Sequence, residues 1–392
     1  MKKTLILAAV AAVALSACSK NEIIETINKV PEEVAIGFSN YTPKTLSKAN
    51  DTYVSGTTLV SGKHFGVYAW QTANGTFLDV TPGTPDFMNP VDVTWAGDTG
   101  SGETNTYSPL RYWPSGDTPA NLSFAAYYPY GGAGITAPTF ATGVGTYAFT
   151  AQSAPADMVD FCVADVVNDQ VYGSTNAGSS YKGTVKFTFK HQLTKVQFKF
   201  KTTEAVSDDA NTTINLVEAK LNNVKTKGTL SATYALASPQ GVNKLGTTTT
   251  AWSDQALAAT PVVYDVTLNT QDPSSSNKIE LTKTASTVAN ADIFLMVPQA
   301  MVDKAGIDPQ YLEVTWEVIT DGVTTTNTQK LYFKNDVYNG DDPDATGYAQ
   351  EDIDWGMNNF ITYTITIGPK PIYFTAAVTG WDAEENGYMN VN

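Results

Sequence analysis

Residues 184–201 read "TVKFTFKHQLTKVQFKFK" and carry the pattern from which the class of fold follows. Its apolar residues alternate with polar ones and are Val185, Phe187, Phe189, Val196, Phe198 and Phe200. A two-residue period places successive side chains on opposite faces of a β-strand, so this stretch predicts two strands, each with one buried face. The letters "HQLT" at residues 191–194 interrupt the period and predict the connection between the two strands.

The same period recurs along most of the chain. It is found in "NLSFAAYYPY" (121–130), "PVVYDVTLN" (261–269), "YLEVTWEVIT" (311–320), "FITYTITI" (360–367) and "IYFTAAVT" (372–379). Threonine and aromatic residues are abundant in these runs, and Gly-, Pro-, Asn- and Asp-rich stretches separate them. The sequence therefore predicts an all-β protein built from sandwiches of antiparallel strands. The segment "LVEAKLNNV" (216–224) fits either a short helix or a strand with a bulge, and the pattern leaves both open.

Length and charge limit the classes of protein that remain. A chain of 392 residues with 42% apolar residues can bury a large core and predicts two domains, divided near His191. The formal net charge of −15 disfavours binding to phosphate backbones, so nucleic acid is not an expected partner.

The first residues predict export. Lys2 and Lys3 precede an apolar run that ends in "LSAC" (15–18), which resembles the lipobox of bacterial lipoproteins. This predicts a signal peptide over residues 1–17, acylation of Cys18 and a tether over residues 18–33. An ordinary secretory signal with a chance cysteine is the alternative.

Residues for catalysis or for binding metals are scarce. The two histidines, His64 and His191, adjoin strands and are interpreted as hydrogen-bonded structural residues, and Cys162 as a small core residue. No nucleophile elbow, phosphate loop or set of zinc ligands is recognisable, so we expect no enzyme activity, no cofactor and no metal. The acidic run "NDVYNGDDPDATGYAQEDIDWG" offers Asp336, Asp341, Asp342 and Asp344 as oxygen ligands for calcium, but it lacks the full EF-hand pattern, and a solvated loop is the favoured interpretation.

The first predicted strand is followed by two lysines. Val34, Ile36 and Phe38 alternate with other residues, and the loop after them contains Lys44 and Lys48. An exposed linker explains this arrangement, and so does a protease site that releases the strand.

Several motifs, in this order, resemble the fimbrillin family (type V, Mfa-like pilins) of Gram-negative bacteria. They are "RYWPSG" (111–116), "LSFAAYYPY" (122–130), "FTFKHQLTKVQFKF" (187–200), "IFLMVPQ" (293–299) and "WGMNNFITYTITI" (355–367), which leads to Trp381. The resemblance implies two tandem transthyretin-like β-sandwich domains, at residues 34–190 and 191–392. It also implies a lipoprotein of the outer membrane that becomes a pilus subunit in the shaft, tip or anchor and mediates cell adhesion.

Assembly in this family implies a site for each step. A protease removes the first strand (Val34, Ile36, Phe38), and a strand of another pilin subunit fills the groove. Related chains carry an arginine after this strand, whereas this chain has Lys48, and Lys44 as a second choice. The candidate donor strand carries Ile372, Phe374, Ala376 and Val378. The acidic tail after Trp381 is unlike a simple donor and fits a tip or anchor subunit.

Two other functions compete with this interpretation. A surface lipoprotein that binds a glycan on a host or bacterial receptor would use exposed tryptophans, for which Trp70, Trp95 and Trp252 are candidates. A glycosidase is the third possibility, and its carboxylates are not recognisable from spacing alone.

Overall fold

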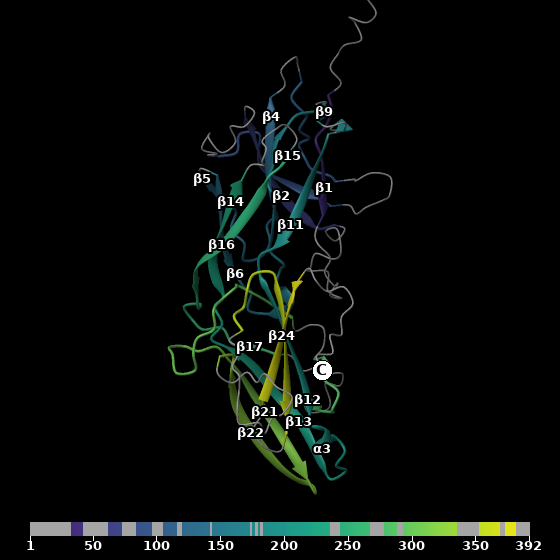
Figure 1. The fold of residues 1–392 in the computed structure, drawn as a ribbon, viewed down its shortest axis with the longest axis vertical. Coiled ribbons are helices and arrows are strands. Elements are labelled where there is room, and N and C mark those ends of the chain that lie inside the picture. Colours follow the sequence, from purple (N-terminus) through teal and green to yellow (C-terminus); the bar gives the residue numbers. More distant parts are fainter. Residues whose placement is uncertain are drawn as a thin grey trace, which may run out of the picture.

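The molecule is elongated and almost entirely β-structure (Figure 1). The computed structural model describes residues 33–41, 62–72, 84–95, 105–115, 120–141, 143–172, 175–176, 179–180, 183–235, 244–266, 278–287, 293–334, 353–368 and 373–381. The expected all-β fold is confirmed. Among these residues, no helix is long and apolar enough to cross a membrane.

The upper half of Figure 1 is organised around a sheet of eight strands. Six of them follow the order β1-β11-β7-β4-β2-β3, while β8 pairs with β4 and β15 pairs with β8. Only β1 runs parallel to its neighbour, β11. The bounds are β1 Gly37–Tyr41, β2 His64–Thr72, β3 Met88–Thr94, β4 Asn121–Tyr128, β7 Cys162–Ala164, β8 Val167–Gln170, β11 Thr184–His191 and β15 Lys244–Leu245.

A second sheet in the upper half has the order β16-β14-β6-β5. Its strands are β5 Thr139–Ala141, β6 Val144–Thr150, β14 Lys227–Ala235 and β16 Thr247–Ala256. A two-stranded ribbon, β9 Thr175–Asn176 and β10 Ser179–Ser180, and a 3₁₀ turn, η1 Pro155–Asp157, complete this part of the described chain.

Two five-stranded sheets form the lower half. One has the order β19-β12-β23-β24 with β20 beside β12, and its strands are β12 Thr194–Thr202, β19 Ser286–Thr287, β20 Ile293–Met296, β23 Asn359–Ile367 and β24 Tyr373–Gly380. The other has the order β17-β13-β21-β22 with β18 beside β13. Its strands are β13 Thr212–Asn222, β17 Tyr264–Asp265, β18 Ile279–Glu280, β21 Tyr311–Thr320 and β22 Val323–Tyr332, and the short helix α3 Glu204–Ser207 precedes β13.

Apolar side chains pack between these layers. Strand β4 is buried on both faces, so that Tyr127 belongs to one apolar cluster and Phe124 to a second. The first cluster continues into the lower half, where Phe198 of β12 stacks on Tyr363 of β23 with ring centroids 5.6 Å apart. Burial of apolar area on this scale is the main stabilising contribution to an all-β chain.

The segment 216–224 is a strand with a bulge, as one of the two predicted alternatives had it. The pairing of β13 with β21 shifts register between Leu216 and Glu218, so Val217 is the extra residue. Before the bulge Leu216 is buried, and after it Ala219 and Leu221 are buried. The bulge therefore switches which residues face the core, and this switch produced the helix-like spacing.

The predicted division into two domains at residue 190 stays a prediction. One feature of the sheets bears on it: β14, which comes after residue 190, pairs with β6, which comes before it, and β16 pairs with β14. Strands β14 and β16 thus belong to the sheets of the upper half (Figure 1).

Candidate functional site

The first strand of the described chain is held along both of its edges. On one side β1 pairs with β11, with Phe38 opposite Val185. On the other side the Ile36 amide donates to the Arg111 carbonyl at 2.9 Å, and the Trp113 amide donates to the Val34 carbonyl at 3.0 Å. Segment 34–41 therefore lies between β11 and residues 105–113, which act as two walls.

Side chains add to the second wall. The Tyr107 hydroxyl donates to the Ile36 carbonyl at 2.8 Å, and the Asn105 side-chain amide donates to the Phe38 carbonyl. Burial raises the pKa of Tyr107, so its hydroxyl keeps the proton that it donates. Periodicity does not single out these two residues, because they lie outside any periodic run; the neighbouring "RYWPSG" motif is the signal that the sequence offers.

The floor beneath β1 is aromatic. Ile36 and Phe38 are each 1% exposed, and Val34 is half-buried. Rings of four residues surround Phe38, with centroids at 5.3 to 6.5 Å, and they are Phe65, Tyr107, Phe124 and Phe187. The predicted inward alternation of this strand is thus confirmed, while its displacement on assembly stays a prediction.

Glycine is needed at one point of this seam. Gly183 has φ +88°, and a Cβ there would lie 3.2 Å from a Val34 methyl carbon and 3.3 Å from Trp113 Nε1. Its carbonyl accepts from the Gly37 amide at 2.9 Å and from Trp113 Nε1 at 3.1 Å. The bare backbone allows β1 and Trp113 to approach β11 together.

The candidate donor strand is β24, an edge strand that pairs only with β23 among the described strands. Ala376 is partly buried against the first cluster, but Val378 is 44% exposed. Phe374 lies opposite Ile365 in the register, and Ile372 lies outside the described residues. The strand is therefore held mainly by its backbone, with little burial of side chains over residues 375–380.

Trp381 anchors the end of this strand. It is 1% exposed, and its indole stacks on the imidazole of His191 with centroids 4.2 Å apart and planes 3° apart. Its amide donates to the Asn358 carbonyl at 2.7 Å, and Lys195 Nζ lies 5.8 Å from the indole centroid. Trp381, the last described residue, thus packs against the end of β11, where the turn to β12 begins.

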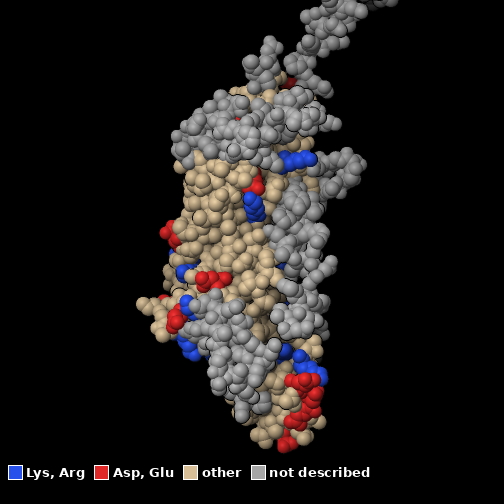
Figure 2. Space-filling view, viewed as in Figure 1, with Lys and Arg blue, Asp and Glu red and all other residues tan. Residues whose placement is uncertain are grey.

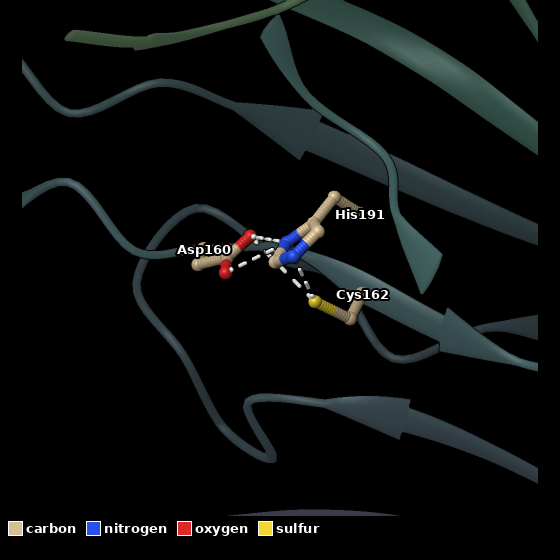
Figure 3. A group of neighbouring side chains, drawn as sticks. All are labelled: Asp160, Cys162 and His191. Carbon is tan, nitrogen blue, oxygen red and sulfur yellow. Dashed lines mark hydrogen bonds and ion pairs between the residues drawn. The ribbon is translucent and has the colours of Figure 1, made fainter. Parts of the chain in front are cut away.

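Beneath that indole lies a cluster of three polar side chains, Asp160, Cys162 and His191 (Figure 3). Both carboxylate oxygens of Asp160 lie within 3.0 Å of His191 Nδ1, and Cys162 Sγ lies 3.5 Å from the same nitrogen. A Cys-His-Asp nucleophile needs the thiol and the carboxylate on different ring nitrogens, so this arrangement does not match one. The prediction that His191 is hydrogen-bonded and Cys162 buried is confirmed.

The second histidine lies far from this cluster in sequence and near the surface. His64 Nδ1 contacts the Asp92 carboxylate at 2.9 Å, and both side chains are nearly half exposed. The predicted hydrogen bond of this histidine is thus confirmed.

The tryptophans proposed for glycan binding do not form an exposed platform. Trp70 and Trp95 are 4% and 1% exposed, so they are core residues, as is usual for tryptophans in strands, and do not supply the exposed rings that glycan binding would need. Trp252 is partly buried, and its indole N–H donates to the Gln192 carbonyl at 2.8 Å. These rings lie in strands β2 and β16 and directly after β3, where their large apolar area packs into the interior.

Several predicted residues lie outside the part of the chain that the structure describes. They are Cys18, Lys44, Lys48, Ile372 and the acidic run with Asp336, Asp341, Asp342 and Asp344.

The described surface in the view of Figure 2 carries few charged side chains. Acidic side chains gather at the lower end, and basic ones are scattered rather than grouped (Figure 2).

Comparison with known proteins agrees with this architecture. The sequence profile of the fimbrillin-like family matches residues 52–381. The fimbrium subunit Fim1C of Phocaeicola vulgatus is 30% identical over 206 residues, which is 49% of this chain and 49% of that protein. The alignment thus spans about half the length of that relative.

One solved structure extends the likeness of the fold to most of the chain. A fimbrial protein from Bacteroides vulgatus superposes with a TM-score of 0.57 and 20% identity, covering 88% of this chain and 99% of that one. A putative cell adhesion protein from Bacteroides uniformis gives a TM-score of 0.43 and 18% identity, covering 90% and 100%. The match of the family profile spans more than half of the sequence, and the chain belongs to the fimbrillin-like family.

Proposed function

We propose that this chain is a pilus subunit, in the shaft, tip or anchor, that is exported as an outer-membrane lipoprotein through Cys18 and mediates adhesion without catalysis. It assembles with other pilin subunits by exchange of β-strands after cleavage at Lys48 or Lys44. The observation that carries this proposal is that segment 34–41 lies between two hydrogen-bonding walls over an aromatic floor.

Removal of this segment would leave a groove that favours a new strand. The amides and carbonyls that now pair with Val34, Ile36 and Gly37 would lose their partners. The sites of Ile36 and Phe38 would also be exposed, at about 1.5–3 kcal/mol for each large apolar side chain. Both losses are recovered when another extended segment enters the groove.

Strand β24 has the features expected of a donor. It is eight residues long, as is segment 34–41, and it lies at the edge of its sheet, with the side chains of residues 375–380 mostly exposed. Residues 375–380 therefore lose little apolar burial when the strand leaves its own subunit, and the buried Trp381 is the larger loss. Phe374 and Ala376 are two residues apart, like Ile36 and Phe38, and would face the same floor.

The first experiment tests cleavage. The full chain with Cys18→Ala, which cannot be acylated, is treated with a lysine-specific protease, and the new N-terminus is sequenced. We expect Ala49 or Thr45 at that end, followed by a ladder of SDS-resistant oligomers that collapses on heating. The Lys44→Ala/Lys48→Ala double variant should remain monomeric. Oligomers that form equally without cleavage would contradict the proposed trigger.

The second experiment tests the groove. A fluorescent peptide of residues 371–381, "PIYFTAAVTGW", is added to cleaved and uncleaved protein, and its anisotropy is measured. We expect binding only after cleavage. The matched peptide with Ile372→Ser and Phe374→Ser should bind at least about tenfold more weakly, because each change removes about 1.5–3 kcal/mol of apolar burial. Equal binding of the two peptides would exclude β24 as the donor.

A further inference from the structure

We propose that Asp160, Cys162 and His191 form a binding site for one divalent transition-metal ion of the zinc class. The ligands are one Asp160 carboxylate oxygen, Cys162 Sγ and His191 Nδ1, which all lie within 4.8 Å of one another (Figure 3). The test below uses the uncleaved chain, in which Trp381 still stacks on His191, so it and the test of the pilus function can fail separately.

The backbone brings the three ligands together. Cys162 of β7 and His191 of β11 are directly opposite each other in an antiparallel register. Residues opposite each other in a sheet project their side chains to the same face, and so do residues two apart in a strand. Asp160 comes two residues before Cys162, which places its carboxylate beside the thiol. Neighbouring strands thus hold Cys162 and His191, and the segment that leads into β7 holds Asp160.

Distances between the ligand atoms suit a tetrahedral ion. Sγ lies 3.5 Å from Nδ1 and 3.6 Å from Asp160 Oδ1, and Nδ1 lies 3.0 Å from the same oxygen. Bonds of about 2.3 Å to sulfur and about 2.0 Å to nitrogen and oxygen at tetrahedral angles give edges of about 3.5 Å to sulfur and about 3.3 Å between the other two. The three observed distances agree with these edges to within about 0.4 Å.

Charge and burial favour a dication over separate charged groups. The side chains of Asp160 and His191 are 0% exposed, and Cys162 is also 0% exposed. An enclosed carboxylate is costly unless its charge is compensated. A dication with one thiolate, one carboxylate and one neutral imidazole has no net charge. Binding therefore releases the thiol proton and places the remaining ring proton of His191 on Nε2.

The alternative is a hydrogen-bonded cluster without an ion. In that case Nδ1–H donates to Asp160 and the thiol donates to Asp160 Oδ1. The two states differ in the thiol: it is a bonded thiolate with the ion and a protonated thiol without it.

The experiment uses Co²⁺ as a spectroscopic probe and Zn²⁺ as the competing ion. The full chain with Cys18→Ala keeps Cys162 as its single thiol. Because the ligands are enclosed, each metal is added both to the native protein and before refolding from urea. We expect one ion per chain, a thiolate-to-cobalt charge-transfer band that Zn²⁺ abolishes, and a higher melting temperature.

Two variants separate this site from other metal binding. Cys162→Ala preserves most of the packing, and it should abolish the charge-transfer band and weaken binding at least about a hundredfold. His64→Ala removes the other histidine and should change neither result. Absence of the charge-transfer band under both loading conditions, or equal binding by Cys162→Ala, would overturn the site and leave the hydrogen-bonded cluster.

Discussion

The indole of Trp381 lies flat on the imidazole of His191, with the two rings 4.2 Å apart and 3° from parallel. His191 ends β11 in the upper half of the molecule, and Trp381 follows β24 in the lower half. The contact thus fixes the end of an otherwise exposed edge strand to the turn that joins the two halves. Since residues 375–380 bury little side-chain area, this stack is the main side-chain attachment of that end of β24.

Replacing Trp381 by Ala should release β24. Loss of a buried tryptophan typically costs about 3–5 kcal/mol, and here the loss is concentrated at one edge strand. We expect the amides of residues 373–380 to exchange hydrogen at least about a hundredfold faster, measured by exchange with mass spectrometry. Val378→Ala, on the same strand but exposed, is the control. Unchanged protection in Trp381→Ala would show that the backbone pairs alone hold the strand.

Replacing Phe38 by Ala should destabilise the upper half. The side chain is 1% exposed and contacts four aromatic rings, so its truncation leaves a cavity costing about 3–5 kcal/mol. The measurement is urea unfolding followed by tryptophan fluorescence. Val34→Ala serves as the comparison and should cost less, because Val34 is half-buried. A larger loss of stability in Val34→Ala than in Phe38→Ala would mean that Phe38 does not pack on the aromatic floor.

Deleting Val217 should be tolerated far better than deleting Lys220. Loss of the bulge residue makes the pairs on its two sides consecutive, so Ala219 and Leu221 keep their partners and still face the core. Deleting Lys220, in the regular part of the strand, shifts the register so that Ala219 or Leu221 turns away from the core. We expect the Val217 deletion to retain a cooperative thermal transition and the Lys220 deletion to lose it. Equal melting temperatures of the two variants would contradict Val217 as the extra residue.

Alkaline pH should unfold the protein through its buried tyrosines. Burial raises the pKa of Tyr234 and of Tyr264 to about 12, above the ordinary value of 10.0. The folded state therefore retains these protons longer than the unfolded state does. Stability from this source is complete below pH 10 and falls by about 1.4 kcal/mol per pH unit for each group as the pH rises towards 12.

The measurement is urea unfolding between pH 9 and 12, with tyrosinate absorbance recorded in parallel. Tyr264→Phe cannot ionise at this position. We therefore expect its free energy of unfolding to fall less steeply with pH, by about 1.4 kcal/mol per pH unit. The exposed Tyr172 provides the control, and Tyr172→Phe should leave the slope unchanged. If the free energy of unfolding depends on pH equally in Tyr264→Phe and in the parent chain, Tyr264 does not contribute to the loss of stability at alkaline pH.

Local pattern was sufficient to identify many of the strands. The alternation at Val185, Phe187 and Phe189 is the alternation of buried residues in β11, and the break at residues 191–194 contains the turn to β12. The pattern was ambiguous at Val217, because a bulge changes the phase of a strand and one shifted residue resembles a helical repeat. For Trp70 and Trp95 the residue type favours the interior, but only the tertiary structure shows that each ring is covered.

The class of fold and the inward residues of the first strand follow from the amino-acid sequence alone, because a two-residue period depends only on the geometry of one strand. Which segments are neighbours is visible only in three dimensions: β1 beside β11, β14 beside β6, and His191 between Asp160 and Trp381. These contacts join residues far apart in the chain. Their selection depends on packing and hydrogen bonding across the whole fold, which no local period encodes.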